Sequence, residues 1–315
     1  MEILRYAKAL ADETRCRLIR LLMDFELNVG EIVQIMNMGQ SRVSRHLKIL
    51  VDSGLAASRR DGLWTFYAAV PEGRGRLFLS GAAPFFEDDG AAEKDLETAR
   101  RLVSERSLLS RRFFDEAAPV WQDLSREILG DFDLAQRVKT LLPACGTAAD
   151  LGCGSGALLS ALASKAKNVI GVDYSPRMLE AARERFAGDG RVSLRIGELE
   201  HLPLRDGEAD CVLLSMALHH LSAPGDGLTE AYRALAPGGR LLVADFDRHE
   251  NEDLRRRHGD RRLGFATDEM RAFMEQAGFV AISEAGRAPL TSGLVLVFTT
   301  AEKPGNASGA ASAQK

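Results

Sequence analysis

The spacing of apolar residues predicts three helices in the N-terminal part of the chain. The first, over residues 11–24, has one apolar stripe and begins at Asp12, a residue type that caps helix N-termini. A second, shorter helix follows at residues 29–37. The third, over residues 41–54, repeats apolar residues at i, i+4, i+7 and i+8 and ends at Gly54, where a glycine can form a left-handed cap.

Two strand-like runs occupy residues 55–70 and meet at Asp61 and Gly62, a dipeptide that strongly favours a hairpin turn. Helix, turn, third helix and hairpin in this order predict a winged helix-turn-helix domain over residues 1–72. Successive residues of an α-helix lie about 100° apart around its axis, so four polar residues of the third helix lie opposite its apolar face. These are Ser41, Arg42, Arg45 and Lys48.

A surface of this kind can read DNA. Between residues 40 and 60 the sequence holds five Lys or Arg residues and one acidic residue, a balance that suits contacts with phosphates. The first turn of the third helix would reach base edges in the major groove, and the hairpin would lie beside phosphates. The candidate DNA-binding residues are Gln40, Ser41, Arg42, Arg45, Lys48, Arg59 and Arg60. The alternative is a solvated helix face of a winged helix that binds another protein.

The pattern changes in the second half of the chain. From residue 141 to residue 302, short apolar runs such as AADLG (148–152) and LLVADF (241–246) alternate with helical segments. This alternation predicts a doubly wound α/β domain with a mostly parallel sheet, so the fold class of the chain is α/β plus α. In such sheets ligands bind beyond the carboxyl ends of the strands, near the point where the strand order reverses.

Three glycines, Gly152, Gly154 and Gly156, follow the first strand of this domain. Without β-carbons the chain can bend sharply there, and a ligand can approach main-chain N–H groups. Asp173 ends the second strand, seventeen residues after Gly156, where its carboxylate can bind two ribose hydroxyls. The glycine spacing differs from the GxGxxG of nicotinamide-binding domains. We therefore expect a nucleoside site of another kind.

Residues 73–140, between the two domains, are predicted to form a helical connector, because leucines recur near helical periods among many i,i+4 charge pairs. Its simplest interpretation is a packing or dimerisation arm. Residues 303–315 are small and polar, and we expect a disordered tail.

Composition fits two globular domains. The chain has 315 residues, 45% of them hydrophobic, and a net charge of −4. Residues 1–70 hold ten Lys and Arg against eight Asp and Glu (net +2), and the remaining residues hold 31 against 37 (net −6). A mildly basic N-terminal segment on an otherwise acidic chain suits a polyanion as the binding partner of that segment. The apolar runs are too short to span a bilayer and no signal-peptide core is present, so we expect a cytoplasmic protein without a membrane partner.

Four cysteines lack CxxC pairing and metal-ligand spacing: Cys16, Cys145, Cys153 and Cys211. We expect reduced, structural thiols and no metal site.

The segments KALADETRCRLIRLL, QSRVSRHLKIL and RRDGLWTFY make the first 70 residues resemble the ArsR-type winged-helix repressors. The resemblance implies a homodimer that binds palindromic double-stranded operator DNA. Many of these repressors sense metals through cysteines. Here ELNVGE (26–31) stands where the thiol-containing segment would be, so direct sensing of soft metals there is not expected.

A second resemblance covers about 155 residues of the C-terminal half. DLGCGSG (150–156), Asp173, GELEHLPLRDGEADCV (197–212), SMALHHL (215–221) and LAPGGRLLVADF (235–246) together resemble the class I S-adenosylmethionine-dependent methyltransferases of the type 11 kind. The resemblance implies a Rossmann-like fold that binds S-adenosylmethionine or S-adenosylhomocysteine. It assigns the methionine end to Asp150, Gly152, Gly154 and Gly156, the ribose to Asp173, the adenine edge to Glu198 and Leu199, and the cleft wall to Ser215.

Other residues of this region are weaker candidates. Phe114 and Trp121 resemble an aromatic lid segment, with core packing as the alternative. His219 and His220 could supply a general base, but the family gives this pair no fixed catalytic role, and no catalytic residue is assigned.

Two functions follow from these resemblances. The chain is interpreted as a DNA-binding transcriptional regulator, a repressor whose C-terminal domain responds to S-adenosylmethionine or S-adenosylhomocysteine and controls genes of the methionine and methyl cycle. The alternative is an active methyltransferase of unknown acceptor, whose winged helix controls its own gene or locates a substrate.

Overall fold

The computed structural model describes residues 1–86 and 90–305 and divides the chain into two units, residues 1–108 and 109–315. The division falls within the segment predicted as a helical connector, 73–140, inside its helix Gly90–Ala117. Of the tail predicted to be disordered, all but residues 303–305 lies outside the described residues. No helix within the described ranges has the length and apolar character to cross a membrane.

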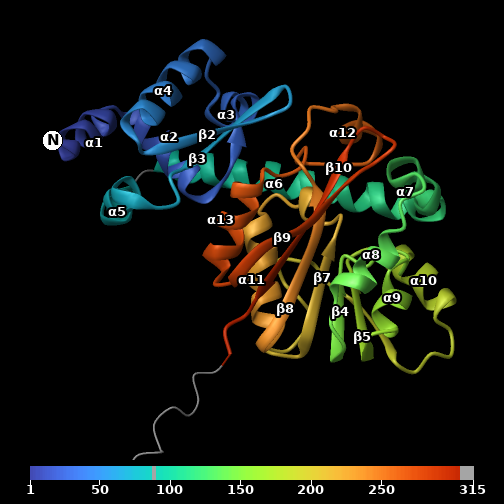
Figure 1. Ribbon diagram of the computed structural model, residues 1–315. Coiled ribbons are helices and arrows are strands. Elements are labelled where there is room, and N and C mark those ends of the chain that lie inside the picture. Colours follow the sequence, from blue (N-terminus) through green and yellow to red (C-terminus); the bar gives the residue numbers. More distant parts are fainter. Residues whose placement is uncertain (87–89, 306–315) are drawn as a thin grey trace, which may run out of the picture. The chain divides into compact units, whose positions relative to one another are not determined.

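Unit 1 is mostly helical and carries a small antiparallel sheet of order β1-β3-β2 (Figure 1). In chain order its elements are α1 (Glu2–Leu10), α2 (Glu13–Asp24), β1 (Leu27–Asn28), α3 (Val29–Met36), α4 (Gln40–Ser53), β2 (Ala56–Asp61), β3 (Trp64–Ala69), α5 (Gly73–Ala82), the 3₁₀ turn η1 (Ala83–Phe86) and the start of α6 (Gly90–Ala117). The three predicted helices and the hairpin are present, and α1 is an additional helix.

Local chemistry explains where these helices begin and end. The Asp12 carboxylate accepts a hydrogen bond from the Arg15 N–H at 3.0 Å and so caps α2 as predicted. Gly54 ends α4 with a φ of 79°, in the left-handed region that favours glycine. In the hairpin Asp61 pairs with Trp64, so the turn consists of Gly62 and Leu63, one residue later than expected.

The core of unit 1 includes part of α6. Leu96 and Ala99 are buried in the same apolar cluster as Leu18 of α2 and Leu47 of α4. In addition, Arg17 donates two hydrogen bonds, of 2.8 and 2.9 Å, to the buried Asp95 carboxylate. The first half of α6 is therefore an integral part of the helix-turn-helix unit rather than a solvated linker.

Unit 2 is an α/β domain. After the end of α6 come η2 (Ala118–Val120), α7 (Trp121–Leu129), α8 (Leu134–Leu141), β4 (Cys145–Leu151), α9 (Leu159–Ala163), β5 (Ala166–Asp173), α10 (Pro176–Arg185), β6 (Val192–Ile196), β7 (Ala209–Ser215), η3 (Leu218–His220), α11 (Pro224–Ala234), β8 (Leu235–Phe246), α12 (Asp253–Arg257), α13 (Thr267–Ala277), β9 (Val280–Pro289) and β10 (Val295–Glu302).

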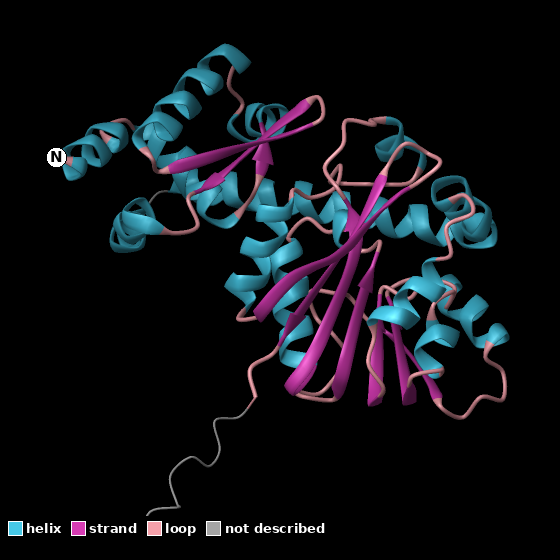
Figure 2. Ribbon diagram, viewed as in Figure 1, coloured by secondary structure: helices cyan, strands magenta, loops and turns pink. Residues whose placement is uncertain are grey.

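Seven strands form one sheet of order β6-β5-β4-β7-β8-β10-β9 (Figure 2). The first five in this order are parallel, and β10 runs antiparallel to β8 and β9. The chain proceeds from β4 toward β5 and β6, and then from β7 toward β8 on the other side of β4. The strand order therefore reverses between β4 and β7, and their carboxyl ends mark the expected ligand site. The predicted fold class is confirmed.

Alternate residues of each strand enter two apolar layers. Ala149 and Leu151 of β4 pack in the cluster that includes α11 and α13, whereas Ala148 packs in the cluster that includes α8, α9 and α10. Figure 1 shows these two sets of helices on opposite sides of the sheet. The near-continuous apolar strands of the sequence follow from this double cover.

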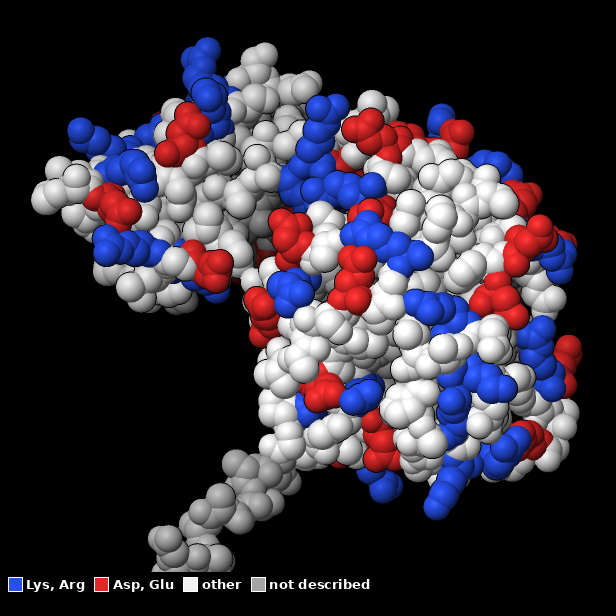
Figure 3. Space-filling view, viewed as in Figure 1, with Lys and Arg blue, Asp and Glu red and all other residues white. Residues whose placement is uncertain are grey.

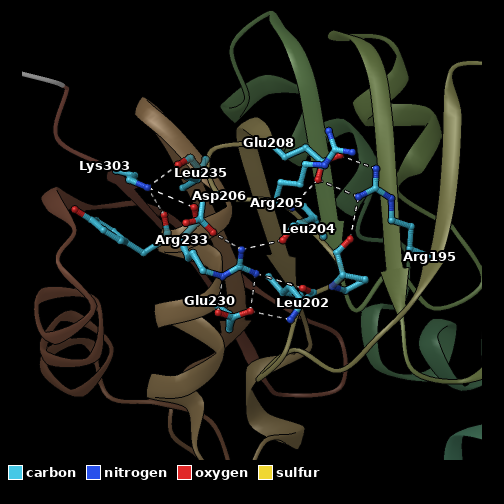
Figure 4. Close-up of polar contacts among 12 residues, drawn as sticks. Arg195, Leu202, Leu204, Arg205, Asp206, Glu208, Glu230, Arg233, Leu235 and Lys303 are labelled. Carbon is cyan, nitrogen blue, oxygen red and sulfur yellow. Dashed lines mark hydrogen bonds and ion pairs between the residues drawn. The ribbon is translucent and has the colours of Figure 1, made fainter.

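An ion-pair network holds the loop between β6 and β7 (Figure 4). Arg233 of α11 donates to both oxygens of Glu230, at 2.7 and 2.8 Å, to Asp206 at 2.7 Å, and to the Leu204 carbonyl at 2.8 Å. Glu230 in turn accepts from the Leu202 N–H at 2.8 Å. The loop that contains residues 198 and 199 is thereby tied to α11.

We expect Arg233→Met to lower the free energy of unfolding by about 2 kcal/mol, because each half-buried acceptor left without its donor costs about 1–3 kcal/mol. Urea denaturation measures the change. Arg126→Met is the matched control, since it removes only an exposed pair with Asp123, and its cost should stay below about 1 kcal/mol. Equal losses in the two variants would contradict this role of Arg233.

Candidate functional site

The glycine turn after β4 is bent by three residues in the left-handed region, with φ of 79° at Gly152, 52° at Gly154 and 76° at Gly156. Their surroundings differ. A β-carbon at Gly156 would lie 3.1 Å from the Phe186 ring, so this glycine serves the packing of the turn. A β-carbon at Gly154 would instead meet Trp121 Nε1 at 3.4 Å, so Gly154 faces the aromatic side chain that was expected to cover a ligand.

The main-chain N–H groups of the first and third glycines, and of Cys153 between them, are already used inside the protein. The N–H groups of Gly152 and Cys153 both donate to the Val172 carbonyl, at 2.8 and 2.9 Å, and the Gly156 N–H donates to the Cys153 carbonyl at 2.9 Å. The expected contact between a ligand and these N–H groups is therefore not available in this conformation. What the glycines offer is a bare backbone surface against which a flat ligand can lie.

Two buried carboxylates stand at the carboxyl ends of β4 and β5. Asp173 is 8% exposed and accepts one hydrogen bond on each oxygen, from Gly154 N–H and from Ser175 N–H, both at 2.9 Å. Each oxygen keeps a further lone pair, which a ribose hydroxyl could use. Asp150 is 2% exposed.

Burial dominates the acidity of both groups. It raises the pKa of Asp173 to about 6, although the backbone N–H donors of Ser175, Gly154 and Tyr174 oppose it, and burial together with the Asp173 charge raises the pKa of Asp150 to about 7. Perturbed carboxylates at the switch point of a doubly wound sheet make this position a candidate ligand site.

The other predicted residues of the cleft lie at different distances from the turn. Leu199 is buried, and its Cδ1 would lie 3.7 Å from a β-carbon at Gly152, so the structure brings these two together. Ser215 ends β7, and its buried hydroxyl has no hydrogen-bond partner among the described residues. Glu198 is half-buried and forms a backbone bridge with His201.

Sequence reasoning missed Ser155. Its hydroxyl lies inside the glycine turn, buried and without a hydrogen-bond partner within the described part of the chain. Two unpaired hydroxyls near one turn are unusual, because buried polar groups are nearly always satisfied. The only available signal was its position between the second and third glycines.

The two residues of the candidate lid segment, Phe114 and Trp121, belong to an aromatic cluster, in which Trp121 lies against Gly154 of the turn. The Phe114 ring, at the end of α6, lies 5.3 Å from the Trp121 ring, 5.9 Å from Tyr174 and 4.7 Å from His220, each in an edge-to-face arrangement. Phe114 is buried. The contacts of Phe114 are therefore compatible with both interpretations, a side chain that covers a ligand and a side chain that packs in the core.

Both histidines of the HH pair belong to a buried polar cluster. His219 Nδ1 lies 2.6 Å from Asp245 Oδ1, and His219 Nε2 lies 3.6 Å from Asp260 Oδ1. Burial lowers the pKa of His219, but the two carboxylates outweigh it and raise that pKa to about 9. Burial lowers the pKa of His220, and the neighbouring His219 charge adds to this effect. A cationic His219 is a poor general base, which disfavours that role.

In unit 1 the predicted DNA-reading residues of α4 all point outward. Gln40, Ser41, Arg42, Arg45 and Lys48 are exposed, while Val43, Leu47 and Leu50 on the opposite face are fully buried. Figure 3 shows Lys and Arg side chains projecting over α4. The helix therefore offers the kind of surface that a major groove admits.

The wing arginines differ from each other. Arg60 is exposed. Arg59 is half-buried and donates to both oxygens of Glu26 at 3.0 Å and to Asp61 at 2.5 Å. A guanidinium already held by two carboxylates is poorly placed to neutralise a phosphate. Arg60 therefore remains a candidate for DNA contact, whereas the contacts of Arg59 fasten the wing to the residues before β1.

The fold and these two sites define a helix-turn-helix protein with a Rossmann-like C-terminal domain. Residues 12–58 match the family described as bacterial regulatory protein, arsR family, and residues 149–243 match the family described as methyltransferase domain. The chain thus joins an ArsR-family helix-turn-helix to a methyltransferase domain, as the two resemblances indicated.

Similar proteins cover the chain only in part. An uncharacterized 37.1 kDa protein of transposon TN4556 from Streptomyces fradiae is 37% identical over 48% of this chain and 46% of its own length. The demethylmenaquinone methyltransferase of Clavibacter sepedonicus is 34% identical over 42% of this chain and 56% of its own length. The chain therefore spans about half the length of these relatives.

Among solved structures, a chain of the complex that contains the Haloferax volcanii Trm112 methyltransferase activator is similar, with a TM-score of 0.50 and 24% identity. The match covers 61% of this chain and 97% of that one, and it concerns the fold alone.

We expect the affinity for S-adenosylhomocysteine to rise with pH between about 5 and 7. An ionised carboxylate accepts ribose hydroxyls best, and protons compete for Asp173 and Asp150 below their raised pKa values of about 6 and about 7. Well below these values each group costs up to about tenfold in affinity per pH unit, and above them the curve levels off. Calorimetric titration at a series of pH values measures the effect.

Asp173→Asn should flatten part of this curve, whereas the exposed Asp253→Asn in the same unit should leave it unchanged. A pH-independent affinity in the unmodified protein would show that neither carboxylate contacts the ligand in its ionised form.

Proposed function

We propose that the protein is a DNA-binding transcriptional repressor whose C-terminal domain binds S-adenosylmethionine or S-adenosylhomocysteine and thereby changes its affinity for operator DNA. The observation that carries the proposal is the union, in one chain, of an outward-facing basic helix and a glycine turn beside two buried acids at the carboxyl ends of neighbouring strands. Genes of the methionine and methyl cycle are the natural targets, because their products set the ratio of the two nucleosides.

A regulator requires fewer binding sites in its C-terminal domain than a methyltransferase does. It requires the nucleoside cleft and an energetic link to the DNA surface, but no pocket for a methyl acceptor. A coupling free energy of about 1–3 kcal/mol, equivalent to a 5- to 150-fold change in operator affinity, is enough for a response. The two nucleosides differ by one methyl group and one positive charge, so selectivity depends on the groups that surround the ligand sulfur.

The proposal includes a homodimer on a two-fold symmetric operator in the cytoplasm. Unit 1 exposes large apolar side chains that a monomer would not need, at Ile3 and Leu4 on α1, Leu77 on α5 and Phe85 on η1. Self-association would bury such exposed apolar side chains, and two-fold symmetry would present two copies of α4 to successive major grooves.

A working methyltransferase is the second candidate. It is supported by the similarity of residues in the C-terminal domain to a demethylmenaquinone methyltransferase. In that case the winged helix would control the protein's own gene or locate a substrate. Transfer of a labelled methyl group from S-adenosylmethionine to a component of a cell extract distinguishes this candidate from a sensor.

Arg45→Ala should weaken binding to DNA from upstream of the protein's own gene and should lower the slope of log affinity against log salt by about 1, because one phosphate or base contact is lost. Fluorescence anisotropy at several salt concentrations measures both. The matched control is Arg76→Ala, which removes an exposed arginine of α5 in the same unit. If both variants bind DNA like the unmodified protein, α4 is not the reading helix.

Asp173→Ala should lower the affinity for either nucleoside by at least about tenfold, since a charge-assisted hydrogen bond contributes about 1.5–3 kcal/mol. Operator binding in the absence of nucleoside should stay unchanged. Calorimetry with each nucleoside, with and without operator DNA, gives the affinities and the coupling between sites. A DNA affinity that ignores both nucleosides at saturation would refute the regulator while leaving nucleoside binding intact.

A further inference from the structure

Three metal-ligating side chains converge beside the loop that follows β7. His219 and His220 lie on η3, and Asp260 lies in the loop after α12, about 40 residues later. One potential ligand atom from each lies within 4.8 Å of the others. Asp260 Oδ1 is 3.6 Å from His219 Nε2 and 3.8 Å from His220 Nδ1.

These separations are close to those of a metal centre. Nitrogen and oxygen ligands lie about 2.1 Å from a divalent transition metal, which places neighbouring ligands roughly 3.0–3.4 Å apart. The two Asp260 distances of 3.6 and 3.8 Å need a contraction of a few tenths of an ångström. The three ligand atoms together span up to 4.8 Å, so rotation of the two rings must also bring the imidazole nitrogens closer to each other. His220 Nδ1 lies 3.4 Å from the Gly259 carbonyl, and it would exchange this contact for the ion.

The neighbouring groups already orient the ligands. Asp245 Oδ1 accepts from the Phe246 N–H at 2.8 Å and contacts His219 Nδ1 at 2.6 Å, which turns Nε2 of that ring toward Asp260. The His219 carbonyl accepts from the N–H groups of Arg261 and Arg262, at 3.0 and 2.9 Å, so the two loops are tied together. A carboxylate behind a ligating histidine is the usual outer shell of a metal site.

The charge balance of the cluster also favours a cation. Asp245 and Asp260 are 2% and 5% exposed, and the second oxygen of each is buried without a hydrogen-bond partner among the described residues. Of the arginines packed nearby, Arg255 pairs with Glu252 and Arg262 pairs with Glu269. His219 and Arg255 supply positive charge near Asp260, and a cation at the unbonded carboxylate oxygens would further offset the cost of burying these two groups.

We propose that His219, His220 and Asp260 bind one divalent transition-metal ion, with Asp245 holding His219 in the ligating orientation. Two imidazoles and one carboxylate suit ions such as Zn²⁺ or Co²⁺ better than Mg²⁺ or Ca²⁺, which prefer oxygen ligands. Three protein ligands leave at least one position for water or for an oxygen or sulfur atom of a small molecule. Phe114, which packs against His220, lies beside this centre.

Titration of the full-length, chelator-treated protein with Zn²⁺ by calorimetry, and with Co²⁺ by visible absorption, tests the proposal without nucleoside or DNA. We expect one ion per chain and Co²⁺ d–d bands of a low-symmetry site. His220→Asn and Asp260→Asn should each lower the Zn²⁺ affinity by about 100-fold or more, and Asp245→Asn by about 10- to 100-fold.

His201→Asn is the matched control, because it removes an exposed imidazole of the same unit outside the cluster, and it should bind Zn²⁺ like the unmodified protein. Thermal melting confirms that each variant is folded; His220 is only partly buried, so His220→Asn decides the question if Asp260→Asn does not fold. The proposal is overturned if the unmodified protein binds no ion at concentrations well above its own, or if His220→Asn keeps full affinity. The cluster would then be an internal hydrogen-bonded network only.

Discussion

The nucleoside end of the molecule depends on the hydrogen bonds from two main-chain N–H groups to the buried carboxylate of Asp173. The Gly154 donor belongs to the turn after β4 and the Ser175 donor to the start of α10, so one side chain fixes the ends of two neighbouring strands. Burial of a carboxylate is tolerated only because these donors offset part of the lost hydration. Its raised pKa measures how incomplete that compensation is, and a ligand with two hydroxyl donors would complete it.

The same reasoning separates the two kinds of buried acid in unit 2. Glu208 is also acidic and half-buried, yet Arg195 lowers its pKa to about 2, because a guanidinium lies 2.7 Å away. Among the described residues no cation pairs with Asp150 or Asp173, and the pKa values of these two groups rise. The first arrangement stabilises the loop between β6 and β7, whereas the second leaves two buried carboxylates that the hydrogen-bond donors of a ligand could satisfy. Folding alone does not require such perturbed acids, which makes this position a candidate site.

Much of the fold was predictable from periodicity and motifs. Buried residues at helical spacing identified α4, Asp12 and Gly54 marked helix ends, and the glycine turn with Asp173 located the switch point. Helix α1 was not predicted, because it buries only Tyr6 and Ala9, which is too few apolar positions to give a periodic signal. The division at residue 108 was not predicted either, because the sequence of α6 does not reveal that Leu96 and Ala99 pack against distant helices.

Side-chain partnerships were the least predictable part of the sites. Arg59 was predicted to bind DNA because it is an arginine in the wing, but Glu26, 33 residues earlier, holds its guanidinium. His219 and His220 were conspicuous in the sequence, yet their chemistry depends on Asp245 and Asp260, which the sheet and the loop after α12 bring to them. A histidine between two carboxylates holds a proton or a metal rather than taking a proton from a substrate. That change of role, from base to fixed charge, follows from long-range contacts alone. The Phe114 ring contacts both His220 of this cluster and Trp121, which lies against Gly154 of the glycine turn.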